Sequence, residues 1–131
     1  MSSSGVWGVV IKQDVLKRNN LHFHEYFGPG TENYCGEDTI FLQEMINKGV
    51  KFYRSPVDIA AIDQTESTWF NGHDQKYFYV TGMVFATCYP KLCRLIVIRS
   101  AFRFSRKKDC KLSFFKILSA YNKGISKIKK G

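Results

Sequence analysis

The spacing of apolar residues in the first part of the chain predicts short strands separated by helical segments. Val6–Asp14, Val50–Tyr53 and Val57–Ile62 each carry an apolar run of the length of a buried strand. Pro56 ends the second of these runs or confines it to a sheet edge. Asp14–Asn20 reads as a helical turn that ends at a pair of asparagines.

A glycine-rich loop leads into the best-defined helix of this part, around which the rest of the chain is organised. Asp38 stands at the predicted N-cap, and Gly49 is a natural C′ residue where the helix stops. Glycines allow the preceding loop to adopt backbone angles that side chains forbid. The loop contains Gly28, Pro29, Gly30 and Gly36, and the apolar positions of the helix are Phe41, Leu42, Met45 and Ile46.

From Asp74 onward the pattern is helical. A first helix should end before Pro90, a second covers Leu92–Phe104, and a third covers Leu112–Lys130. The second is dense in aliphatic residues over Leu95–Ile98 and has arginines at its edges. One apolar stripe is predicted for the third helix, formed by Leu112, Phe115, Leu118, Tyr121, Ile125 and Ile128.

Length and composition favour one folded, intracellular domain. The chain has 131 residues, of which 44% are hydrophobic and 15% aromatic, and this excludes a disordered protein. Its four cysteines form no CxxC pair and no zinc-finger spacing, so we expect reduced thiols in a cytosolic protein. The N-terminus lacks the pattern of a signal peptide, and no apolar run approaches the ~20 residues that cross a bilayer.

Charge divides the chain into two unequal parts. Residues 91–131 contain 13 Lys and Arg against a single acid, whereas residues 1–90 have a net charge of −3. Basic amphipathic helices suit an anionic membrane surface, and they equally suit a helical bundle with a solvated cationic side. Nucleic acid fits less well, because long aliphatic residues are interleaved with the basic ones.

One long ordered pattern resembles a known family. It runs from LHFHEYFGPGT through GEDTIFLQEMINKGVKFYRSP to AIDQTESTWFNGHDQKYFYVTG. This order is similar to that in the C-terminal half of family-2 glycosyltransferases of the GT-A type, and it covers roughly Val6 to Gly82. The resemblance does not extend to the nucleotide-binding half of such enzymes. It implies an α/β fold, the C-terminal part of a Rossmann-like sheet, followed by amphipathic helices.

The resemblance implies that Asp38 is the catalytic base and Glu37 the neighbouring acceptor-site acid. In an inverting transfer, such a carboxylate removes the proton of the attacking hydroxyl. The alternative is that Asp38 only caps the helix and Glu37 is a first-turn acid favoured by the helix dipole, and both descriptions can hold together. Gly30, Gly36 and Glu25 would lie beside the acceptor. Trp69 either stacks on a sugar ring or pins its loop to the core.

Metal binding is less clearly indicated. By resemblance, Asp63 takes the place of a histidine that helps to hold a divalent ion, Mg²⁺ or Mn²⁺, although it could equally cap a loop. His22 and His24 stand two residues apart and Glu25 follows directly, but core and rim histidines explain them better than a metal cluster. The chain has no Asp-x-Asp pair. We therefore expect the ion to bind in a complete enzyme and not tightly to this chain alone.

These observations predict an acceptor-side half of a glycosyltransferase, with a catalytic region in residues 1–82 and a basic helical tail in residues 83–131. It would use a nucleotide-sugar and a glycan or lipid-linked acceptor, and it would be inactive alone as a truncated or partial protein. A half-sheet would need a second copy or another chain to cover it. Its expected location is the cytoplasm, at the inner face of the membrane. The rival hypothesis is a non-catalytic module that binds a membrane surface or a partner.

Overall fold

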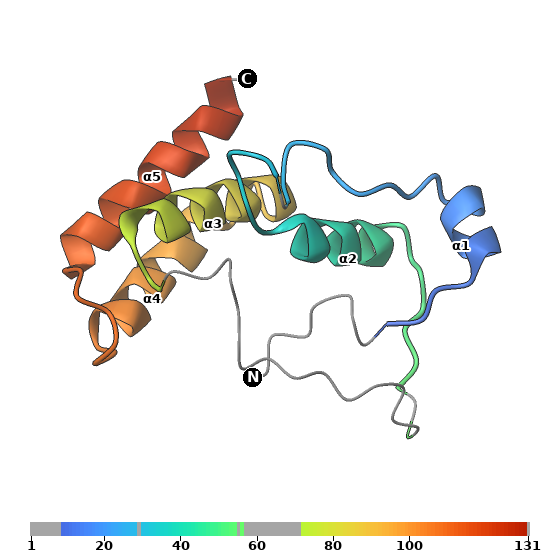
Figure 1. The fold of residues 1–131 in the computed structure, drawn as a ribbon, viewed down its shortest axis with the longest axis horizontal. Coiled ribbons are helices and arrows are strands. Elements are labelled where there is room, and N and C mark those ends of the chain that lie inside the picture. Colours follow the sequence, from blue (N-terminus) through green and yellow to red (C-terminus); the bar gives the residue numbers. More distant parts are fainter. Residues whose placement is uncertain (1–8, 29, 55, 57–71, 131) are drawn as a thin grey trace.

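The regular structure of the described chain is entirely helical. A computed structural model describes residues 9–28, 30–54, 56 and 72–130. Figure 1 shows that α3, α4 and α5 pack together, that α2 lies beside α3, and that α1 stands at the far end of α2. The helices are α1 (Gln13–Arg18), α2 (Glu37–Asn47), α3 (Gln75–Cys88), α4 (Cys93–Ser105) and α5 (Phe114–Lys130).

The predicted α/β fold is therefore wrong, because the described ranges contain helices and no strand. Of the first predicted strand, residues 9–12 are irregular, residues 13 and 14 begin α1, and residues 6–8 lie outside the described residues. Val50–Tyr53 is irregular too, and Tyr53 is 86% exposed. An extended segment becomes a strand only when a neighbouring strand accepts its backbone hydrogen bonds, and no such partner lies beside these residues in the described part. Val57–Ile62 lies outside the described residues.

The C-terminal ends of α1 and α2 are determined by residues with left-handed backbone conformation. After α2, Gly49 has φ +73°, its N–H donates to Ile46 O at 2.9 Å, and Val50 N–H donates to Met45 O at 3.0 Å. Asn20 ends α1 in the same way with φ +46°. Both are Schellman-type ends, in which the left-handed residue satisfies carbonyls that the helix leaves open. The predictions for Gly49 and for the asparagine pair are confirmed.

Helices α3 and α5 cross so closely that only glycine fits at two positions. A Cβ placed on Gly124 of α5 would lie 2.1 Å from Tyr79 O of α3. A Cβ on Gly82 of α3 would lie 2.5 Å from Tyr121 O of α5. The two glycines face each other's helix, and the surrounding Phe78 is fully buried. This crossing brings the two backbones together and forms the centre of the fold.

Tyr121 connects the crossing to α4. Its side chain is fully buried, and its hydroxyl lies 2.8 Å from Ser100 Oγ of α4. Burial raises the pKa of Tyr121 to about 12, although the hydrogen bond with Ser100 opposes this. The stripe predicted for α5 is correct at Tyr121 and Ile125 but wrong at Phe115, which is 80% exposed.

Helix α2 and its leading loop pack on α3 through a second apolar cluster. Phe27 and Ile40 are buried there with Val80, Met83 and Val84. The structure also joins Tyr89 to α2, since its hydroxyl donates to Gln43 Oε1 at 2.6 Å. Helix α2 is thereby held against the helical core. The predicted division after residue 82 falls within α3 and stays a prediction.

Candidate functional site

Glu37 and Asp38 are the first two residues of α2, where the helix dipole favours negative charge. The N-cap is Gly36, with φ +104°, and not Asp38 as the sequence predicted. Gly36 can take this position because it has no side chain: a Cβ there would lie 2.3 Å from Val84 Cγ2. Both acids are half-buried. The structure thus places the pair side by side on a helix end that is anchored to α3.

The loop before α2 folds back over Glu37. Gly28 N–H donates to Asn33 O at 2.8 Å, and Thr31 Oγ1 donates to Gly28 O at 2.9 Å. Asn33, which is 5% exposed, donates from Nδ2 to Tyr26 O at 3.0 Å. A Cβ on Gly28 would lie 3.4 Å from Glu37 Cδ. These hydrogen bonds fix a compact turn whose backbone forms one wall beside the carboxylate.

The surroundings of Glu37 disfavour its ionised form. Burial raises the pKa of Glu37, and Asp38 raises it further, while a hydrogen bond from the backbone of Glu37 itself opposes them. Burial, followed by the charge of Glu37, raises the pKa of Cys35 to about 11. A thiol with this pKa stays protonated at neutral pH, so Cys35 is not poised as a thiolate nucleophile. This helix end thus presents two carboxylates beside a protonated thiol.

We expect Glu37→Gln to raise the free energy of unfolding more at pH 7 than at pH 4. The folded-state pKa of Glu37 lies above the ordinary value of 4.5, so the ionised side chain opposes folding above the raised pKa. This cost disappears as the pH falls through the raised pKa. Denaturant unfolding of wild type and variant at both pH values measures it. An equal difference between variant and wild type at pH 7 and at pH 4 would contradict the burial of the Glu37 charge. Glu32→Gln, at an exposed position, is the control.

The other predicted site residues are not gathered around the pair. Glu25 lines an open hollow with Glu44 and Lys48, toward the opposite end of α2. Gly30 is exposed at the tip of the loop, with φ +86° and nothing within 4 Å of an added Cβ. Trp69 and Asp63 lie outside the described residues. Of the predicted set, the structure therefore brings together Glu37, Asp38 and Gly36.

The histidines and cysteines form no metal centre in the part of the chain that the structure describes, where no cluster of three or more ligands occurs. His22 Nε2 lies 2.8 Å from Asn20 Oδ1, and the His24 ring packs edge-on against Phe27 at 5.3 Å. Phe27 is buried, whereas Phe23 is 52% exposed and stacks on Phe41. All four cysteines are free thiols.

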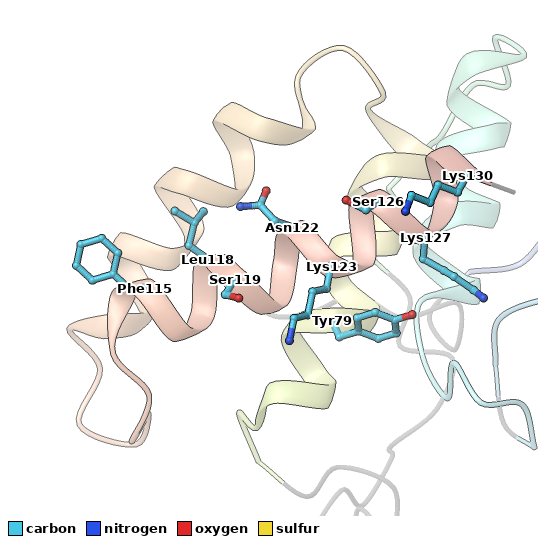
Figure 2. Close-up of a pocket in the computed structure, with 9 residues that line it drawn as sticks. All are labelled: Tyr79, Phe115, Leu118, Ser119, Asn122, Lys123, Ser126, Lys127 and Lys130. Carbon is cyan, nitrogen blue, oxygen red and sulfur yellow. The ribbon is translucent and has the colours of Figure 1, made fainter.

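A separate hollow lies along α3 and α5, away from the carboxylates. Figure 2 shows Tyr79 of α3 beside Lys123 of α5, with Phe115 toward one end of the hollow and Lys130 toward the other. It follows the polar side of α5 and is open to solvent. Neither Glu37 nor Asp38 lines it. This hollow is a solvent-exposed side of the helix. No residue that lines it carries a carboxylate or a thiol.

Asn33 is the one residue of this region whose importance the sequence analysis missed. It is the only buried polar residue of the described chain, and it holds the turn over Glu37. An asparagine between the loop glycines and the helix was the available signal, since its amide can satisfy backbone groups of a turn.

Comparisons with protein-family models, with curated proteins and with solved structures find no match to this chain. No described helix combines the length and apolar character that crossing a bilayer requires.

Proposed function

We propose that the chain supplies the acceptor side of a glycosyl transfer from a nucleotide-sugar to a glycan or lipid-linked acceptor, with Asp38 as the base. Asp38 takes the proton of the acceptor hydroxyl as that oxygen attacks the anomeric carbon of the donor. Glu37, directly beside it, accepts a hydrogen bond from a second hydroxyl of the acceptor. The proposal concerns the chemistry of the pair and not the α/β architecture, which the helical structure excludes.

The observation that carries the proposal is the placement of two adjacent carboxylates at one anchored helix end. Gly36 packs on α3, and the hydrogen-bonded turn at Gly28 walls one side of Glu37. A base must be held in position while its substrate moves, and a helix end fixed to a core provides that. The surrounding Gly-Glu-Asp motif and the long pattern on both sides of it support the assignment to glycosyl transfer.

A divalent ion and the nucleotide belong to the complete enzyme in this proposal. Asp63 is the proposed contributor to the metal site, and Trp69 to the acceptor site. The ion would neutralise the departing diphosphate. We place the protein in the cytoplasm, where nucleotide-sugars are available, and we expect no transfer by the 131-residue chain alone.

The second candidate is a non-catalytic module in which α2 is scaffold. It is favoured by the fact that Glu37 and Asp38 occupy the first helical turn, where acids stabilise a helix without any catalytic task. Asp38→Asn in a transferase reconstituted with a donor-binding half separates the two. Loss of transfer with retained folding supports the base, and an unchanged rate rejects it.

A further inference from the structure

Helix α4 carries apolar side chains on two opposite sides. One side, formed by Cys93, Val97 and Ala101, is buried against the core. The opposite side is exposed although it is equally apolar. We call it the α4 outer face, and it consists of Leu92 (55% exposed), Leu95 (67%), Ile98 (48%) and Phe102 (52%).

These four residues form one continuous row. Leu92, Leu95, Ile98 and Phe102 are spaced three or four residues apart, which aligns them along one side of a helix. Isolated exposed apolar residues are ordinary on a protein surface, but a row along a whole helix marks an interaction surface.

Arginines border the row on both sides. At 100° per residue, Arg94 falls on the Ile98 edge of the α4 outer face. Arg99 and Arg103 fall on the opposite edge, on either side of Leu92. Just beyond the helix, Arg106 places its guanidinium carbon 3.9 Å from the centroid of the Phe102 ring. There is no acid in α4, and Asp109 is the only acid between residues 91 and 131. The partner must therefore be apolar at its centre and anionic at its rim.

We propose that the α4 outer face binds the surface of an anionic lipid bilayer, with α4 parallel to the membrane plane. The leucine, isoleucine and phenylalanine side chains enter the acyl boundary, and the arginines extend to the lipid phosphates. At 13 residues α4 is too short to span, which leaves an in-plane orientation. A second copy on the same face would set arginine against arginine. Nucleic acid would leave the apolar row uncovered.

The test is co-sedimentation of the full chain with vesicles of phosphatidylcholine containing 30% phosphatidylglycerol, and with pure phosphatidylcholine vesicles. We expect binding to the anionic vesicles at least about tenfold stronger than to the neutral ones, since each basic residue near such a surface adds favourable energy. Binding should weaken as salt is raised, because exposed charges are screened. Equal binding to both vesicle types would overturn the proposal.

Two matched pairs of variants locate the binding on α4. Leu95→Gln with Phe102→Gln should lower the partition coefficient about thirtyfold or more, whereas Val10→Gln with Ile46→Gln, equally exposed elsewhere, should leave it nearly unchanged. Replacing Arg94, Arg99 and Arg103 with Gln should lower it more than tenfold. The same loss of charge at Lys123, Lys127 and Lys130 of α5 should have a much smaller effect.

Each contrary result has a definite meaning. If the arginine and lysine variants weaken binding equally, the attraction is general charge and the α4 outer face is not the site. If wild type dimerises in light scattering without lipid and the Leu95/Phe102 variant is monomeric, a second copy covers the face. Helicity by circular dichroism is recorded for every variant, and only variants with wild-type helicity enter the comparison.

Discussion

Asp38→Asn is expected to lower the rate of glycosyl transfer by about 10²–10⁴-fold in a transferase that contains this chain and a donor-binding half, which is the usual contribution of a general base. Asparagine has nearly the same shape but cannot accept the proton of the acceptor hydroxyl. The fall should appear in kcat, because the proton moves in the transition state, and KM for the acceptor should change little.

Asp74→Asn is the matched control for this experiment. Asp74 also stands at the start of a helix, and its carboxylate accepts a hydrogen bond from Tyr77 N at 2.7 Å, so its role there is capping. Asparagine caps nearly as well as aspartate, and Asp74→Asn should therefore leave both rate and folding close to wild type. If the two variants have the same activity, Asp38 is an acid of the helix terminus and not the base.

Gly124→Ala is expected to destabilise the protein by about 2–3 kcal/mol, which corresponds to a fall of roughly 10 °C or more in the unfolding midpoint. In an exposed helix this change would be stabilising by about 1 kcal/mol, because alanine is the better helix former. Here the added methyl would lie 2.1 Å from Tyr79 O, and the helices α3 and α5 must move apart to admit it. Thermal unfolding followed by circular dichroism measures the sign directly.

Ser126→Ala separates helix propensity from packing. Ser126 is an exposed residue of the same helix, two positions beyond Gly124. Its replacement should leave the unfolding midpoint unchanged or raise it slightly. A rise in the midpoint for both variants would show that α3 and α5 do not meet at Gly124.

The ends of the helices could be predicted because local chemistry determines them. Gly49 and Asn20 take left-handed backbone, which few residues tolerate, and Pro90 follows the end of α3 as expected. The N-terminus of α2 was predicted two residues late. Gly36 serves as the N-cap with φ +104° and no side-chain hydrogen bond, and Asp38 is the first residue after it whose side chain is of a capping type.

The absence of strands from the described residues could not be predicted, because a strand forms only where residues far away in the chain supply a partner. Val50–Tyr53 has the composition of a strand, but composition alone supplies no neighbour to accept its hydrogen bonds. The rotation of α5 is a similar case. Its apolar residues fit more than one stripe. The close approach of Gly82 to the Tyr121 backbone and of Gly124 to the Tyr79 backbone accompanies the stripe that buries Ile117 and exposes Phe115.

The sequence predicted the part of the candidate site that lies within one short segment of the chain. Glu37, Asp38 and Gly36 are consecutive, so any fold of this segment keeps them together. Glu25 was expected beside them and instead lies with Lys48, since the placement of a distant segment depends on tertiary packing. The apolar residues of α4 are evident in the sequence. Because they lie on two sides of the helix, the sequence did not show which side faces the core.

The crossing of α3 and α5 also affects the order in which the protein can fold during its synthesis. The ribosome releases α3 first, then all of α4, and only afterwards the segment of α5 around Tyr121 that packs on Phe78. Until then the nascent chain presents an apolar α3 without its partner, a state prone to aggregation. Slow translation between the two helices would lengthen this exposure, and a chaperone that binds apolar segments would have its natural target in α3.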